Sequence, residues 1–311
     1  MKTSKEFLLV ICICLCLTGY SCALMAQQAA YQKGTRTGQI SWSRLNEVSG
    51  LVVSRINKGI IWVHNDSGDR PCIYAINPQG DLVATFTVTG AQAVDWEDIA
   101  AGPGPEPNEH YLYIADIGDN HGRRRYVTIY RVKEPMVDPD SRASSGKTAP
   151  ADAIRMVYPD GPKDAEALFV DPLTKDMYVM SKRELFSHLY RLPYPPSTGE
   201  LNRLELVTVL PAGLITAADI SPAGTKIIVR TMTKAYLWER DPNTSLAQAL
   251  RRIPLRLPIQ KELQGEAIGF DPDGMGYYTI GEGRNPVIYY FLPQAGQKET
   301  SPAVDSTDPA G

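Results

Sequence analysis

The sequence predicts an all-β protein, a five-bladed β-propeller, from three observations. A short motif, in which acidic or polar residues precede an aliphatic one, occurs five times: Glu47–Leu51, Asp95–Ala100, Asp164–Leu168, Thr216–Ile220 and Gln264–Ile268. The aliphatic residues of these motifs lie 48, 69, 52 and 48 residues apart, and a period of about 40–50 residues is typical of propeller blades. Short apolar segments bounded by turn residues follow each motif, and one further strand precedes the first.

The first two repeats each contain four predicted strands. In the first repeat they cover residues 51–53, 60–63, 72–76 and 82–88. In the second they cover residues 99–101, 111–115, 126–132 and 153–158. The polar stretch Glu134–Ala149 is predicted to be a surface loop, which accounts for the 69-residue interval. Four antiparallel strands make one blade.

The later repeats keep this order. The third has predicted strands at 167–170, 177–180, 189–192 and 205–210. The fourth has strands around 220 and at 226–229, 235–238 and 252–255, the last after a helical turn at Ser245–Arg251. The fifth has strands at 267–270, 276–280 and 287–292 only. The polar tail at 294–311 is predicted to be disordered.

The missing fourth strand of the last repeat matches a spare strand near the N-terminus. Gly38–Trp42 alternates in polarity, and we expect it to pair with the strand at 287–292. Such pairing closes the ring and removes exposed strand edges. The sequence therefore predicts one propeller domain at 27–293. A six-bladed ring, the alternative, needs about 40 more residues of strand.

The first 26 residues have the layout of a secretory signal peptide. Lys2 and Lys5 precede an apolar run at 7–17, which is too short for a comfortable membrane span, and small residues follow up to Ala26. We expect cleavage after Ala26 and export to the periplasm or the cell exterior, with no transmembrane span. Cleavage before Cys22, which would give a lipid-anchored protein, is the alternative.

Cysteine usage bears on disulfide formation, and net charge bears on nucleic-acid binding. Cleavage after Ala26 leaves only Cys72, so we expect an exported monomer without an intramolecular disulfide. The chain has 311 residues, of which 43% are apolar and 22% charged, and a formal net charge of −3. A negative net charge argues against nucleic acid as a partner.

Acidic residues occupy equivalent places in several repeats. Neighbouring strands of a blade are antiparallel, so residues at the start of the first strand and the end of the second meet at one mouth of the central channel. The candidate metal ligands there are Glu47, Asp95, Glu97, Glu166 and Glu266. A ring of carboxylates needs raised pKa values or a cation, and oxygen ligands favour calcium over magnesium. Ion pairs with Arg123–Arg125, Lys182, Arg183 and Arg230 are the alternative.

A second set of polar residues follows the second strands, at the same predicted mouth. The candidate ligand-binding residues are His64, Asn65, Asp66, Asp116, Asp119, Arg183 and Glu282. The segment 65–69 resembles part of a calcium loop or a tight Asx turn, and the arginines after 116–122 could hold an anion or form a solvated patch. The sequence has no nucleophile motif and no phosphate-binding glycine loop.

Several of these segments, in this order, resemble the SdiA-regulated family of exported bacterial propellers. The matching residues are Val48–Leu51, Asn65 and Asp66, Asp95–Ala100, Glu166–Leu168, Gln264–Ile268 and Glu282, over about 44–293. The resemblance implies a five-bladed propeller, distantly similar to NHL-repeat proteins, with a bound calcium ion and no settled biochemical activity. The family typically has Glu-Gly where this chain has Glu-Asp or Glu-Ala, and the fourth motif here is Ala218-Asp219.

Three functions remain open from the sequence. The first is a calcium-containing propeller that binds a small-molecule or protein ligand at the acidic mouth. The second is a metal-dependent hydrolase, either a phytase-like phosphoesterase or a lactonase- or esterase-like enzyme, because such propellers also place acids around a metal. The third is a purely structural interaction module. Whether the protein is an enzyme stays open at this point.

Overall fold

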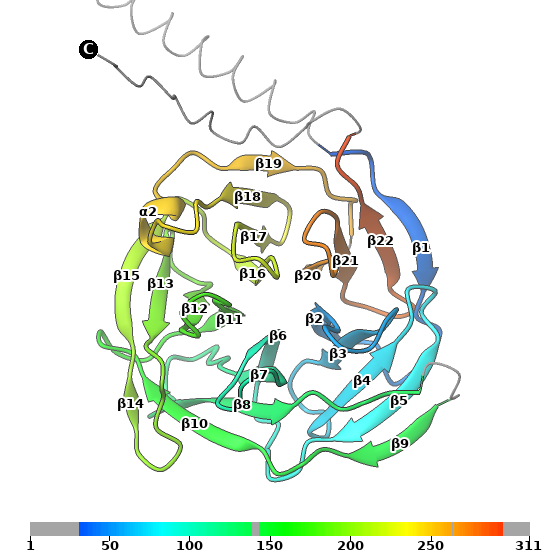
Figure 1. The fold of residues 1–311 in the computed structure, drawn as a ribbon, viewed down its shortest axis with the longest axis horizontal. Coiled ribbons are helices and arrows are strands. Elements are labelled where there is room, and N and C mark those ends of the chain that lie inside the picture. Colours follow the sequence, from blue (N-terminus) through cyan, green and yellow to red (C-terminus); the bar gives the residue numbers. More distant parts are fainter. Residues whose placement is uncertain (1–30, 139–142, 263, 295–311) are drawn as a thin grey trace, which may run out of the picture.

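The computed structural model describes residues 31–138, 143–262 and 264–294. These residues form five small sheets that stand around a central axis, so the protein is an all-β, five-bladed propeller (Figure 1). The predicted signal peptide at 1–26 and the predicted tail from residue 295 onward lie outside the described residues. No helix of the described part is long and apolar enough to cross a membrane.

Each blade runs from an inner strand at the axis to an outer strand at the rim. Blade 1 has β2 (Val48–Val53), β3 (Ile61–Asn65), β4 (Cys72–Ile76) and β5 (Leu82–Thr87). Blade 2 has β6 (Trp96–Pro103), β7 (His110–Asp116), β8 (Val127–Lys133) and β10 (Asp152–Val157). Blade 3 has β11 (Ala165–Val170), β12 (Met177–Ser181), β13 (Ser187–Leu192) and β15 (Glu205–Leu210). Neighbouring strands within these blades are antiparallel.

The last two blades complete the ring. Blade 4 has β16 (Ile215–Ile220), β17 (Lys226–Thr231), β18 (Ala235–Glu239) and β19 (Leu255–Leu257). The predicted helical turn before its outer strand is confirmed as α2 (Leu246–Leu250), which begins with a capping box between Ser245 and Gln248. The outer strand itself begins at Leu255, and the predicted span 252–255 was too early. Blade 5 has β20 (Gly265–Phe270), β21 (Tyr277–Gly281) and β22 (Val287–Phe291).

The N-terminal strand closes the ring, as predicted, but with shifted bounds. Strand β1 covers Thr35–Gln39 and pairs antiparallel with β22, with Thr35 opposite Tyr290. The predicted strand Gly38–Trp42 was three residues too late, because Ile40 leaves the ladder after one last hydrogen bond from its N–H to the Pro286 carbonyl (2.9 Å). Its side chain then packs, fully buried, with residues of blades 1 and 5. Closure with five blades excludes the six-bladed alternative.

Two additional short strands connect neighbouring blades at the rim. Strand β9 (Ser144–Lys147) lies in the stretch predicted to be a surface loop, and it pairs in parallel with β5 of blade 1. Strand β14 (Asn202–Arg203) lies in the sequence between β13 and β15 of blade 3, and it pairs in parallel with β10 of blade 2. Each covers the outer edge of another blade, where unpaired backbone groups would otherwise remain.

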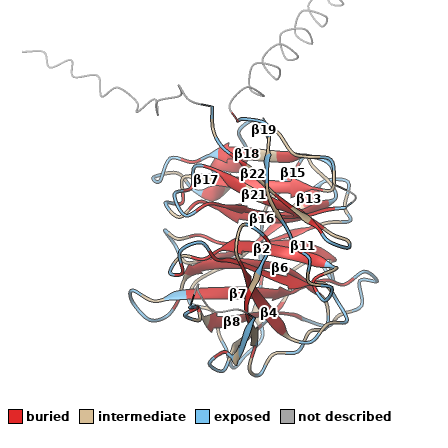
Figure 2. Ribbon diagram, turned by 90° about the vertical axis from the view of Figure 1, so that its right-hand side faces the viewer, coloured by how far each residue is buried: buried red, intermediate tan, exposed pale blue. Residues whose placement is uncertain are grey.

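The core lies between adjacent blades around the axis. All five inner strands of the blades are buried along their whole length except at the last residue of β6 (Figure 2). Trp62 and Trp96 are the largest buried side chains, and both belong to the cluster that joins blades 1 and 2. Because the inner strands are buried on both faces, any polar side chain that they carry must find a partner near the axis.

Candidate functional site

The inner strand of every blade carries a β-bulge at the same place, near its start. The bulged residue, which has no partner in the neighbouring strand, is Ser49, Glu97, Glu166, Thr216 or Glu266. A bulge redirects the extra side chain out of the regular alternation. The five bulges therefore place three glutamates and two hydroxyl residues in equivalent positions around one end of the channel.

This repeat corrects the alignment of the fourth motif. The sequence suggested Asp219 as the counterpart of the three glutamates, but the bulge assigns that place to Thr216. Asp219 lies three residues further along the inner strand. Its carboxylate accepts hydrogen bonds from the backbone N–H groups of Ile220 and Phe270, both at 2.8 Å, and so ties blade 4 to blade 5.

Backbone hydrogen bonds hold this end of each blade together. In all five blades, a residue one or two positions after the second strand donates its N–H to the carbonyl of the residue before the inner strand. The pairs are Asp66 to Glu47 (2.8 Å), Gly118 to Asp95 (3.2 Å), Lys182 to Asp164 (2.9 Å), Met232 to Leu214 (3.3 Å) and Glu282 to Gln264 (2.9 Å). The start of each inner strand and the end of its neighbour, which carry the two predicted sets of polar residues, thus meet at one mouth.

A cavity of about 240 Å³ lies at this mouth, which we call the acidic mouth. Its charged and amide lining comprises Glu47, Asp66, Glu97, Asn120, Glu166, Lys182, Gln264, Glu266 and Glu282. Four of the five predicted metal ligands are in this set, and Asp95 lies beside them. Six carboxylates face one ammonium group, so the cavity is strongly acidic.

Two groups of three carboxylates in the acidic mouth are close enough to share a cation. Oxygens of Asp66, Asp95 and Glu97 all lie within 4.8 Å of one another, and so do oxygens of Glu97, Asp164 and Glu166. We call these the first and second carboxylate groups. Glu97 belongs to both, which places it at the centre of the candidate metal site.

The two groups differ in the cations already beside them. In the second group, Lys182 pairs with Glu166, and the Arg183 Nε lies 2.5 Å from Asp164 Oδ2. In the first group, none of the three carboxylates forms an ion pair with a residue that the structure describes. The salt-bridge alternative therefore describes the second group, whereas no described cation forms an ion pair with the first.

Gly118 lets the first group assemble. A Cβ atom at this position would lie 2.1 Å from Glu97 Oε1 and 2.5 Å from Asp95 Oδ2, far inside van der Waals contact. Only a residue without a side chain allows both carboxylates to approach the turn. Gly118 and Asn120 were not among the residues singled out from the sequence, although both lie in the turn-rich segment Asp116–Gly122.

Burial and mutual repulsion disfavour the ionised forms of these acids. Burial first, and then the carboxylate of Glu166, raises the pKa of Glu97 well above its usual range. Burial raises the pKa of Glu166 to about 8 and that of Glu266 to about 7. Burial, followed by repulsion from Asp66, raises the pKa of Asp95 to about 6. Burial alone would lower the pKa of Lys182, but the facing carboxylates raise it.

Most of the remaining predicted ligand residues form hydrogen bonds or ion pairs with the loops around the mouth. Asn65 donates to the Arg44 carbonyl (2.6 Å) and to the Asp69 carboxylate (2.8 Å). Asp116 pairs with Arg124 (2.8 Å) and accepts from the Asp95 N–H (3.1 Å). Glu282 accepts from Gln264 at the rim of the cavity. These residues position the acidic loops.

His64 does not reach the acidic mouth. Its ring is completely buried, with Nδ1 2.8 Å from the Asn65 carbonyl, and it makes an edge-on contact with Trp96 at 5.7 Å between ring centroids. Burial lowers the pKa of the His64 imidazole, which favours the neutral ring. The sequence prediction placed His64 at the mouth, whereas its side chain points into the core between blades 1 and 2.

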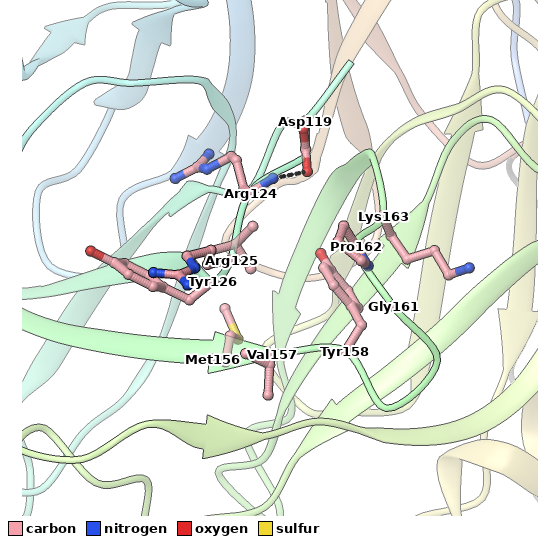
Figure 3. A pocket seen from close by; sticks show the side chains of 11 residues that line it. Asp119, Arg124, Arg125, Tyr126, Met156, Val157, Tyr158, Gly161, Pro162 and Lys163 are labelled. Carbon is pink, nitrogen blue, oxygen red and sulfur yellow. Dashed lines mark hydrogen bonds between the residues drawn. The ribbon is translucent and has the colours of Figure 1, made fainter. Parts of the chain in front are cut away.

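The polar groups of Asp119, at the start of the arginine-rich loop, already form hydrogen bonds within the protein. Asp119 accepts from the backbone N–H groups of Arg123 (2.9 Å) and Arg124 (2.7 Å) and donates its own N–H to Asp164 (2.9 Å). Behind it lies a pocket of about 120 Å³, in which the guanidinium groups of Arg124 and Arg125 point away from Tyr158 (Figure 3). The arginines therefore do not converge on an anion in this pocket.

No model of a known protein family matches the chain, and no curated protein matches it either.

Proposed function

We propose that the protein is an exported, calcium-binding β-propeller that binds a small-molecule or protein ligand at its acidic mouth. The first carboxylate group is the observation that supports this most strongly. Its three oxygens lie within 4.8 Å of one another, and no described cation pairs with them. Two ionised carboxylates about 5 Å apart repel by roughly 3 kcal/mol at an effective dielectric constant of about 20. A bound cation would turn this repulsion into attraction.

The donor set suits calcium. Asp66, Asp95 and Glu97 offer oxygen only, and calcium takes about 6–8 oxygen ligands, some of which can be water. Ions that prefer nitrogen or sulfur would find neither here, because His64 is buried away from the mouth and Cys72 lies in β4. Neutralising the first group would also lower the pKa values of the neighbouring acids, since it removes a like charge.

The remainder of the cavity would receive the ligand. Lys182 and Asn120 supply hydrogen-bond donors beside the metal position, while Glu266 and Glu282 supply acceptors. A ligand rich in hydroxyl groups, or one with a single carboxylate that reaches the cation, fits this mixture. Export is part of the proposal because calcium sites of modest affinity are filled at extracellular calcium concentrations.

A metal-dependent hydrolase is the second candidate. The observation in its favour is that the candidate metal position opens directly into a cavity of about 240 Å³ that also contains Lys182. A cation there would polarise an ester or phosphoester oxygen, and a nearby carboxylate would accept a proton from water. A panel of ester, lactone and phosphoester substrates, with and without chelator, separates this function from ligand binding alone.

Titration calorimetry with calcium tests the proposed site. Purified protein, first freed of metal by a chelator, should bind about one calcium ion per molecule, and Glu97→Gln should abolish the heat signal. Glu200→Gln is a matched control, because Glu200 is exposed on a loop of blade 3, away from the mouth. Absence of calcium binding by the unaltered protein, or normal binding by Glu97→Gln, would contradict the proposal.

A further inference from the structure

The opposite end of the channel has a second, larger cavity. It measures about 500 Å³ and lies where the inner strands end, whereas the acidic mouth lies where they begin. Its floor is formed by Ala101 and Gly102 of blade 2, Val170 of blade 3 and Ile220 of blade 4. Its lining also includes polar and charged residues, namely Arg55, Glu106, Asn108, Glu109, His110, Lys175 and Ser221. A cavity that offers an apolar surface together with polar groups suits a small-molecule ligand.

Arg55 lines this cavity from blade 1, two residues beyond the end of β2. One terminal guanidinium nitrogen, NH1, is buried and has no hydrogen-bond acceptor among the described residues. A buried donor of a charged group without an acceptor is costly, so such a donor requires an explanation. A ligand atom that accepts a hydrogen bond would provide one.

The buried carboxylate of Asp219 does not satisfy this donor. Asp219 is close enough to Arg55 for the positive charge to lower its pKa, although burial keeps that pKa raised, at about 6. Both Asp219 oxygens already accept backbone N–H groups, from Ile220 and Phe270, and no ion pair joins Asp219 to Arg55. Arg55 balances the charge of Asp219 at a distance and leaves its NH1 group available to a ligand.

Other polar groups of the cavity are compatible with an anion at Arg55. Ser221 accepts two backbone N–H groups, from Thr225 (3.1 Å) and Lys226 (3.0 Å), which leaves its own hydroxyl proton available for donation. Glu106 and Glu109 also line the cavity, but both pair with Lys133, and their side chains are 61% and 43% exposed. These two acids thus lie toward the solvent and share the positive charge of Lys133.

We propose that this cavity is a second binding site, which takes a small carboxylate with an apolar body. The carboxylate would accept hydrogen bonds from Arg55 and Ser221, and the apolar part would lie on the strand ends of blades 2, 3 and 4. The site is independent of the metal proposed for the acidic mouth, because no residue is shared between the two cavities.

Titration calorimetry with hexanoate and benzoate tests this site, in chelator so that the acidic mouth plays no part. We expect at least one of the two to bind, while hexan-1-ol, which has the same chain as hexanoate but no charge, binds about tenfold more weakly or not at all. Arg55→Gln should weaken carboxylate binding about tenfold or more. Arg256→Gln, which changes an exposed arginine of β19, should leave it unchanged.

A second variant keeps the test decisive if Arg55→Gln does not fold. Ala101→Leu leaves Arg55 intact and fills part of the apolar floor, so it should also weaken binding about tenfold. Both variants are first checked for a cooperative thermal transition. The proposal is overturned if neither carboxylate binds the unaltered protein, or if a folded Arg55→Gln or Ala101→Leu variant binds the carboxylate as tightly as the unaltered protein.

Discussion

At the scale of single residues, the acidic mouth combines groups that repel one another with groups that hold them in place. Asp98 is one of the residues that fix the inner strands in place. Its buried carboxylate accepts hydrogen bonds from the N–H groups of Ile99 (2.9 Å) and Leu168 (2.9 Å), and it lies 3.4 Å from the N–H of Ala218. One side chain thus joins blades 2, 3 and 4 directly beneath Glu97.

Removing this carboxylate should destabilise the whole propeller. Asp98→Ala would leave at least two buried N–H groups without an acceptor, at a cost of about 2 kcal/mol or more. We therefore expect the melting temperature to fall by about 4 °C or more, measured by calorimetry. Asp273→Ala, at an exposed turn residue, is the control. An unchanged melting temperature would show that Asp98 does not connect the blades.

Gly118 offers a test of the metal site that leaves every carboxylate in the protein. Because a Cβ atom at residue 118 would touch the carboxylates of Glu97 and Asp95, Gly118→Ala should push them apart. Flexible side-chain ends can move at little cost, so the metal-free protein should remain folded. Calcium affinity should fall about tenfold, since the coordination geometry is lost. Gly199→Ala, where a Cβ meets nothing within 4 Å, is the control, and equal affinity in both variants would contradict this view.

At the scale of elements, the blade repeat was predictable from the sequence. The two short strands that pair with the outer edge of another blade, β9 and β14, were not. The inner strands read as apolar runs after an acidic motif, and β1 was found because blade 5 lacked its outer strand. Strands β9 and β14 were missed because Ser144–Lys147 and Asn202–Arg203 have no strand pattern of their own. They are extended because the free edges of β5 and β10 pair with them.

The candidate site was predictable to a similar extent. Glu97, Glu166 and Glu266 were identified because each precedes an inner strand by a fixed spacing. Thr216 was misaligned with Asp219 because the bulge is a backbone feature that the side-chain pattern does not reveal. The burial of His64 was not predictable because strand periodicity cannot tell a buried position at a strand end from an exposed one.

Closure of the ring gives the prediction at this scale. A chain that begins at Ser41 lacks β1, its pairing with β22, and the buried side chains of Tyr31 and Ile40. The exposed edge of β22 and the lost apolar burial should lower the melting temperature by about 10 °C or more. A chain that ends at Gln294 is the control. Equal melting temperatures for the two truncated chains would show that β1 does not stabilise the ring.

At the scale of the whole molecule, the acidic mouth makes stability depend on pH. Burial and repulsion raise the pKa values of Asp95, Glu266 and Glu166 to about 6, 7 and 8. The folded protein therefore binds these protons more tightly than the unfolded chain does. The stability that protonation contributes is present at low pH and is lost as the pH rises through about 6 to 8.

Metal-free protein in chelator should accordingly have a lower melting temperature at about pH 8 than at about pH 6. Added calcium should reverse this trend, because the cation replaces the protons and binds best when the acids are ionised. Differential scanning calorimetry across this range, with and without calcium, provides the check. A metal-free melting temperature that rises steadily from about pH 6 to pH 8 would contradict the predicted repulsion at the acidic mouth.

The most direct test of the calcium site is an anomalous-difference map from crystals grown with calcium. We predict one peak about 2.3–2.6 Å from carboxylate oxygens of Asp66, Asp95 and Glu97, with Lys182 still beside Glu166. The corresponding map from Glu97→Gln crystals should lack this peak. A map of the unaltered protein without a peak at these three residues would contradict the account and leave ion pairs as the counter-charges of the acidic mouth.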